Sequence, residues 1–163
     1  MAKFKIKGLR EYVQEIGRTV AFKAAENITE DLKTLGPYYS GEFEEGWVVK
    51  SGSVSIPANK STSFTVREKW QGWEDGSFPF PRRITPVDIP RQSLGDRYVY
   101  TIGNEMDYRL YAMDLLPGRT PKPGNTAPKD WFVTYFNGSG LRNAIQKSTI
   151  EAKNDAAVKR FRP

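Results

Sequence analysis

The sequence predicts an α+β domain in which a long N-terminal helix packs on a small, mostly antiparallel sheet. Three observations support this prediction. Residues 9–35 carry one apolar stripe at helical spacing, residues 98–103 alternate like a strand, and residues 131–136 and 141 to about 158 have helical patterning. The 163 residues are expected to form a single domain, 1–163, in which residues 57–97 are a long arm or loop insertion.

The predicted long helix follows a short strand at Phe4 and Ile6 that ends at Gly8. Gly36-Pro37 ends the helix, because glycine suits a helix terminus and proline cannot continue one. Apolar side chains recur along the helix at steps of three and four residues, the spacing of one helical face. They are Leu9, Tyr12, Val13, Ile16, Val20, Ala24, Ile28, Leu32 and Leu35.

The next elements are predicted to be strands. Residues 38–41 are expected to form a turn, and residues 47–49 and 54–56 to form a hairpin around Ser51-Gly52-Ser53. Residues 98–103 are predicted as a further strand, followed by a short helix over 108–116 that ends at Pro117-Gly118.

The segment from Pro57 to Asp96 has a different composition. Five of the eleven prolines fall in it, and they exclude a helix and interrupt any sheet. Its aromatic side chains argue against plain disorder, so we expect an ordered arm or long loop, with a strand over residues 63–66.

No pattern in the sequence predicts chemistry. Histidine and cysteine are absent, which removes the commonest general base and the thiol nucleophile. The acidic groups Glu42-Phe43-Glu44-Glu45 and Glu105-Met106-Asp107 lack a metal-loop spacing and are expected to be solvated or salt-bridged. Gly138-Ser139-Gly140 lacks the remainder of a phosphate loop, and Ser139 is expected to cap the following helix. We therefore predict no catalytic, cofactor or metal site, and no enzymatic activity.

Net charge is +6, and the excess lies after residue 56, notably at Arg82-Arg83 and in the basic tail from Lys159 to Arg162. Two interpretations stay open for the arm. Interleaved basic and aromatic residues are typical of single-strand nucleic-acid binding, but aromatic residues and arginine are also enriched at protein interfaces. We favour an interface, whose candidate contact residues are Trp70, Trp73, Phe78, Phe80, Arg82 and Arg83.

Two motifs resemble the neck, or tail-completion, proteins of tailed bacteriophages. The first is the junction from the long helix into the sheet, Gly36-Pro37-Tyr38-Tyr39-Ser40-Gly41 leading to Trp47, in which Pro37, Gly41 and Trp47 are the structural residues. The second is a strand that ends in Gly103-Asn104 and leads through Tyr108 into a short helix. A closing C-terminal helix is also similar to that family.

The resemblance implies a structural virion protein of the neck ring, which joins the head to the tail and continues the DNA channel. The implied partners are further copies of the chain in a ring of about six or twelve, the head-side connector or stopper protein, the tail-terminator or tail-tube protein, and genomic DNA in the lumen. The implied location is the virion neck, with the host cytoplasm during assembly. No apolar run is long enough for a membrane span. Alternatives are a tail-terminator ring protein of the same neck and a single-strand nucleic-acid-binding protein.

Overall fold

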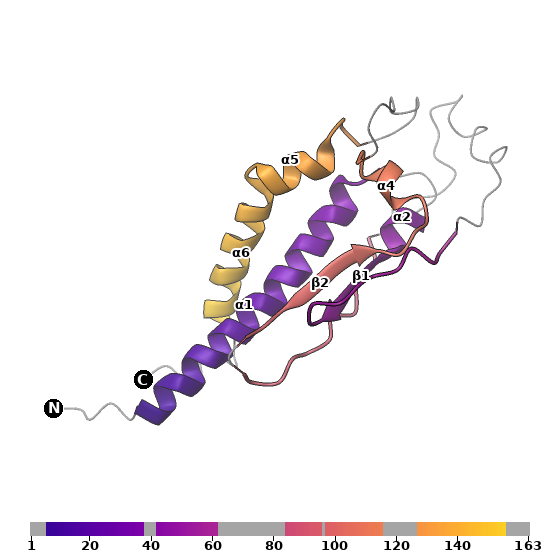
Figure 1. Ribbon diagram of the computed structural model, residues 1–163. Helices are drawn as coiled ribbons and strands as arrows, with labels where there is room; N and C mark the ends of the chain where they lie inside the picture. Colours follow the sequence, from indigo (N-terminus) through magenta and orange to yellow (C-terminus); the bar gives the residue numbers. More distant parts are fainter. Residues whose placement is uncertain (1–5, 38–41, 62–83, 96, 116–126, 156–163) are drawn as a thin grey trace.

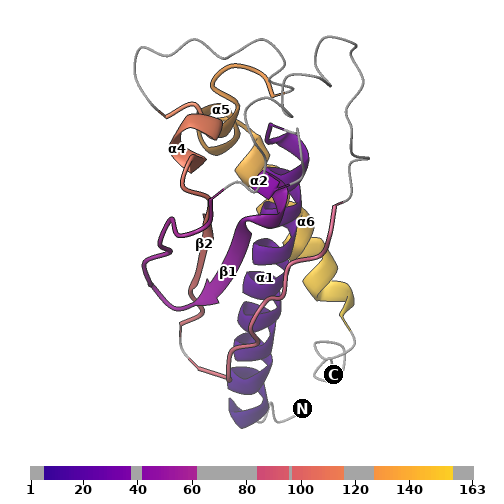
Figure 2. The same ribbon diagram turned by 90° about the vertical axis from the view of Figure 1, so that its right-hand side faces the viewer.

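The computed structural model describes residues 6–37, 42–61, 84–95, 97–115 and 127–155. Figure 1 shows the helix α1 as a middle layer, with a two-stranded sheet on one side and helix α6 on the other, and Figure 2 shows the same order. The predicted α+β fold is confirmed. The elements in chain order are α1 (Ile6–Leu35), α2 (Glu42–Glu45), β1 (Trp47–Ser51), β2 (Tyr100–Asn104), α4 (Arg109–Ala112), α5 (Trp131–Asn137) and α6 (Gly140–Asn154).

The helix α1 begins at Ile6, so the strand predicted for Phe4 and Ile6 is wrong at Ile6, and residues 1–5 lie outside the described residues. Ile6 stands three residues before Leu9 and is in phase with the helical stripe, which outweighs an alternation of only two apolar residues. The helix ends as predicted. Gly36 N–H donates to Leu32 O at 3.1 Å, and Pro37 follows with no N–H to donate.

The sheet pairs β1 with β2 in antiparallel register, from Trp47 opposite Asn104 to Ser51 opposite Tyr100. The predicted hairpin between residues 47–49 and 54–56 is therefore wrong. The chain does turn at Gly52, where φ is +86°. Beyond this turn, however, Val54 N–H donates to the side-chain hydroxyl of Thr101 in β2 at 3.2 Å. Residues 54–56 therefore lie beside β2 but are not a strand of the sheet.

The remaining helices agree with the predictions in position but differ in length. The short helix predicted over 108–116 spans only α4, and Asp114 in the left-handed region (φ 58°) follows it. The helices α5 and α6 confirm the two C-terminal predictions as far as Asn154. Ser139 occupies the position before α6 but its side chain makes no capping hydrogen bond, so that prediction is wrong. The single turn α2 was not predicted.

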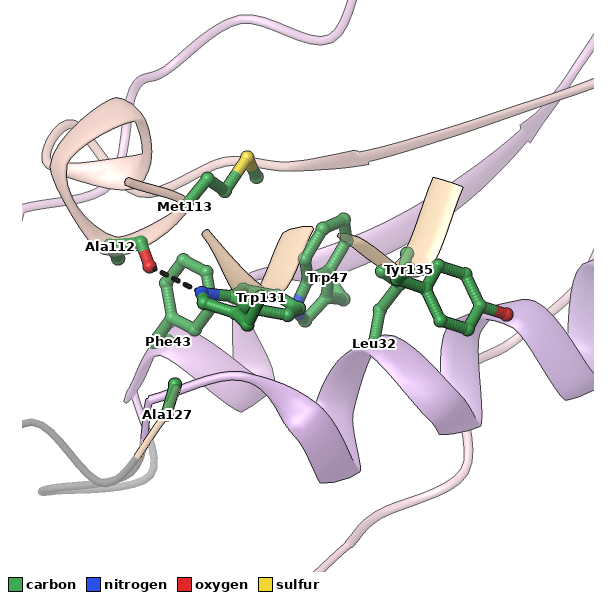
Figure 3. Packing of buried hydrophobic residues seen from close by; sticks show 8 residues of the cluster. All are labelled: Leu32, Phe43, Trp47, Ala112, Met113, Ala127, Trp131 and Tyr135. Atoms are coloured by element: carbon green, nitrogen blue, oxygen red, sulfur yellow. Dashed lines mark hydrogen bonds between the residues drawn. The ribbon is translucent and has the colours of Figure 1, made fainter. Parts of the chain in front are cut away.

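The main core lies where α1 ends against the sheet, α4 and α5, and aromatic rings dominate it (Figure 3). The Phe43 ring lies edge-on to the rings of Trp47 and Trp131, at centroid separations of 5.8 Å and 6.4 Å. Such pairs contribute about 0.5–1.5 kcal/mol each beyond their burial. The Trp131 indole N–H donates to Ala112 O at 2.9 Å and ties α5 to α4. The other buried members are Leu32, Met113, Ala127 and Tyr135.

The seam between α1 and α6 is polar at its centre. Ala144, Ser148 and Ala152 are buried on α6, and their small side chains let the two helices approach closely. Asn27, which is 5% exposed, donates to the Ser148 hydroxyl and to the Glu151 carboxylate, both at 2.9 Å. A buried amide needs such partners, since an unpaired one costs about 1–3 kcal/mol.

Part of the apolar stripe predicted to be buried on α1 is exposed: Leu9 is 49%, Val13 59% and Leu35 43% exposed. For Leu9 and Val13 the reason is the length of the neighbouring helix, which leaves the first turns of α1 uncovered. With 15 residues α6 is half as long as the 30-residue α1, and it ends beside Lys23. Periodicity identified the helix correctly but could not tell how much of its length is covered.

We predict that Tyr135→Phe lowers the free energy of unfolding by about 1–2 kcal/mol at neutral pH, because the Tyr135 hydroxyl donates to Asp31 at 2.9 Å. Burial, followed by the hydrogen bond to Asp31 and its negative charge, raises the pKa of Tyr135. A raised tyrosine pKa contributes stability that is complete below the ordinary value of about 10 and is lost above it. The variant should therefore lose less stability between pH 9 and 11 than the parent protein, as measured by urea denaturation. An equal loss in both proteins would contradict this assignment.

Candidate interaction site

The predicted contact residues Trp70, Trp73, Phe78, Phe80, Arg82 and Arg83 all lie outside the described residues. Of the three predicted junction residues, Gly41 also lies outside, Pro37 is half-buried, and Trp47 is 3% exposed in the aromatic core. The chain is described on both sides of the arm, at residues 57–61 and 84–95. These two arm ends show how the arm is attached to the body.

The outgoing arm end is held beside the end of β2. Lys60 N–H donates to Glu105 O at 3.0 Å, and Asp107 N–H donates to Lys60 O at 2.8 Å. The Lys60 ammonium pairs with the Glu105 carboxylate at 2.8 Å, and the Ser61 hydroxyl donates to Asp107 at 2.9 Å. The acidic pair Glu105 and Asp107 thus fastens the chain just before the arm.

The returning arm end runs along α1 in the opposite direction to the helix. The buried Lys33 ammonium donates to Thr85 O at 2.7 Å, and Ile89 packs with Ala25 and Val49 in a second small core. Desolvation lowers the pKa of Lys33, and the nearby Glu44 and Glu45 charges oppose this effect. The Tyr100 hydroxyl donates to Pro90 O at 3.0 Å. Residues 84–90 therefore form a strap over α1 and the sheet.

Both arm ends leave the body at one end of the molecule. Thr85 contacts Lys33 near the last turn of α1, and Lys60 contacts the residues that lead into α4. Figure 1 shows α2, α4 and the last turns of α1 together at this end.

The two sequence motifs meet at Asn104, which is 1% exposed. Its amide Nδ2–H donates to Phe43 O at 2.7 Å, and its Oδ1 accepts from Met106 N–H at 3.0 Å. The Arg109 guanidinium in turn donates to Asn104 O at 2.6 Å and to Ile56 O at 2.8 Å. The Asn104 amide and the Arg109 guanidinium thus join the junction, the end of β2 and the residue just before the arm.

Close contacts around this point require glycine at two positions. A Cβ at Gly46 would lie 2.6 Å from Asn104 Oδ1 and 2.7 Å from Met106 Cγ. A Cβ at Gly103 would lie 2.8 Å from Ile56 Cδ1. Real Cβ contacts are not this short, so any larger residue would displace either the amide or the chain before the arm.

Glu44 differs from its expected surface position. The cluster Glu42, Glu44 and Glu45 was expected to be a solvated or salt-bridged surface, but Glu44 is only 1% exposed and is therefore not solvated. It lies on α2, whose single turn directs Phe43 and Glu44 inward. In the described part of the chain, no three acidic side chains are grouped so that they could hold a metal ion.

Sequence reasoning missed the buried roles of Asn104 and Arg109 and the strap at residues 84–90. A usable signal for Asn104 was its place directly after a predicted strand, where a side-chain amide can replace ladder hydrogen bonds. The strap had no local signal, because its partners Ala25 and Lys33 lie more than fifty residues earlier in the chain.

No family model matches the chain, and no curated protein and no solved structure matches it. None of the described helices combines the length and apolar character needed to cross a membrane.

We predict that Asn104→Ala lowers the free energy of unfolding by about 2–4 kcal/mol, because it leaves Phe43 O and Met106 N–H buried without their partner. Asn104→Asp keeps the acceptor for Met106 but replaces the donor to Phe43 O, and it should also destabilise. Asn143→Ala, on the exposed side of α6, is the matched control and should change stability by less than about 0.5 kcal/mol. Equal urea midpoints for Asn104→Ala and the control would show that the amide does not join the two motifs.

Proposed function

We propose that this chain is a structural, non-enzymatic protein of a tailed-bacteriophage virion that forms part of the neck ring between head and tail. Its role is mechanical. The subunit contributes interface area, continues the DNA channel, and provides a docking surface for the next ring. Its partners are further copies of itself, the head-side connector or stopper, and the tail-terminator or tail-tube protein.

The observation that carries this proposal is the joining of two motifs found separately in the sequence. The helix-to-sheet junction ends at Trp47, and the Gly103-Asn104 motif lies directly opposite it in the sheet register. The Asn104 amide then reaches back to Phe43 within the junction. Two motifs that resemble one family for structural reasons are expected to lie together, and here the two motifs are in contact.

The arm supports an assembly role for physical reasons. Its ends are fixed to the body by backbone hydrogen bonds and by packing, whereas its predicted contact residues are the types enriched at protein interfaces. In a ring, one surface of each subunit meets a different surface of the next, so an arm that reaches a neighbour suits a heterologous contact.

A second candidate is a single-strand nucleic-acid-binding protein. The observation that favours it is the distribution of charge. The described residues hold nearly equal numbers of basic and acidic side chains, so the net charge of +6 comes from the remaining segments, which include Arg82-Arg83 between aromatic residues. A steep salt dependence of oligonucleotide binding, together with absence from virions, would favour this candidate.

The experiment that tests the neck proposal is quantitative mass spectrometry of purified virions, with copies of this protein counted against the portal protein. We expect a small fixed copy number, on the order of six or twelve, as closed ring symmetry requires. Absence of the protein from particles that contain the portal would contradict the proposal and leave the nucleic-acid candidate.

The arm has its own test. Deletion of residues 70–83 should leave a folded subunit, because the contacts at Lys60, Thr85 and Ile89 that hold the arm ends remain. The deleted subunit should fail to assemble, because it lacks the candidate interface aromatics. Circular dichroism checks folding, and complementation of a phage lacking the protein checks assembly. Ile150→Ser, which removes an apolar side chain 62% exposed on α6, is the control and should complement. Infectious particles containing the deletion variant would show that the arm is not needed.

A further inference from the structure

An open, shallow depression lies between the turn after β1 and the loop before β2. The turn contributes Ser51 and Ser53, and the loop contributes Arg91, Gln92, Ser93 and Arg97. We call these six residues the arginine–serine patch. In the described part of the chain no carboxylate lines the depression, although Asp96, outside the described residues, precedes Arg97 in sequence.

The patch is held in shape by hydrogen bonds between its two segments. The Gln92 amide donates to the Ser51 hydroxyl at 2.8 Å and also to Val99 O. Gly52 N–H donates to Val99 O at 2.8 Å, and the Thr101 hydroxyl donates to Gly52 O at 2.6 Å. The backbone that carries the hydroxyl and guanidinium groups is therefore held in place, which reduces the entropy lost when a ligand binds.

The two arginines of the patch lack the carboxylate partners that several other basic side chains of the described residues have. Arg18 pairs with Glu15 at 2.6 Å, and Lys60 and Lys147 also have carboxylate partners. Within the described residues neither Arg91 nor Arg97 forms an ion pair, and the Arg91 guanidinium lies 5.8 Å from the centre of the Phe22 ring. Guanidinium groups with nearby hydroxyls are suited to phosphate oxygens, which accept several hydrogen bonds and carry the opposite charge.

The patch lies beside the middle of α1. Arg91 lies against Phe22, and Tyr98, next to Arg97 in the chain, lies against Gly17. The patch is therefore separated along α1 from the contact between Thr85 and Lys33, where the returning arm end is held.

We propose that the arginine–serine patch binds the sugar–phosphate backbone of double-stranded DNA. An open depression suits an extended polyanion, whereas a small anion is usually enclosed. No aromatic residue lines the depression among the described residues, although base stacking and protein interfaces both rely on aromatic side chains. The inference rests on the proposed neck function, which brings DNA past the subunit, and it assigns the surface that faces this DNA.

The test is fluorescence anisotropy of a labelled duplex of about 30 base pairs, titrated with the full-length protein over a series of salt concentrations. Arg91→Gln with Arg97→Gln is compared with Lys129→Gln and Arg142→Gln, two exposed cations outside the patch, near the start of α5 and of α6. Both double variants lose the same net charge. The patch variant should lower the slope of log K against log salt by about two, roughly one per lost phosphate contact. The control should leave this slope nearly unchanged, and the loss should not depend on DNA sequence.

Equal losses in the two double variants would overturn the proposal, because binding would then follow net charge alone. Three other results would also overturn it. The parent protein could bind a single strand more tightly than the duplex, or could fail to bind the duplex at all. Polyglutamate could also displace the labelled duplex as effectively as unlabelled duplex does. The single variant Arg97→Gln controls for misfolding of the double variant, because Arg97 is exposed and its substitution leaves the contact between Arg91 and Phe22 intact. This single variant should lower the slope of log K against log salt by about one. Virion copy number is measured separately. A protein present in the neck whose patch variant binds duplex normally would refute this inference and leave the neck function intact.

Discussion

The helix α1 is buried on two opposite sides, and the rest of the described structure depends on this constraint. A two-stranded sheet is at best marginally stable alone, so β1 and β2 need the surface that α1 provides. The helix α6 packs on the other side. A helix in this position can carry polar side chains on its buried sides only where a partner meets each one. Asn27 meets Ser148 and Glu151 across the α6 seam, and Lys33 meets Thr85 on the strap.

Because these partners come from distant parts of the chain, the polar positions also specify how the layers are aligned. A shift of α6 by one turn along α1 would leave Asn27 and Ser148 buried without each other, at a cost of about 1–3 kcal/mol for each unsatisfied group. The apolar contacts alone would tolerate such a shift better, since the small residues Ala144 and Ala152 occupy equivalent positions about two turns apart on α6. The buried hydrogen bonds therefore supply specificity that the modest apolar core lacks.

Patterns within a few neighbouring residues predicted the helices, but they did not predict which strand pairs with β1. The stripe on α1 and its end at Gly36-Pro37 depend on neighbours within four residues, and so do α5 and α6. The partner of β1 lies about fifty residues away, so a nearby apolar segment, residues 54–56, was the natural but incorrect choice. The candidate site likewise has a part that the sequence predicted and a part that it did not. Composition indicated the arm and its aromatic residues, but Asn104, the strap and the patch depend on contacts between segments far apart in sequence. Among the described residues, Arg91 also differs from Arg18 in lacking a carboxylate partner, which a count of charges in the sequence does not reveal.

The two surfaces that we assign to the subunit contact α1 at different points along its length. Thr85 at the returning arm end contacts Lys33 in the last turn of α1, whereas Arg91 of the arginine–serine patch contacts Phe22, near the middle of the helix. At 1.5 Å per residue, these two contact points are about 16 Å apart along the helix. Substitutions so far apart, without shared partners, act independently on stability. A defect in assembly caused by the arm and a defect in DNA binding caused by the patch should therefore be separable in one subunit.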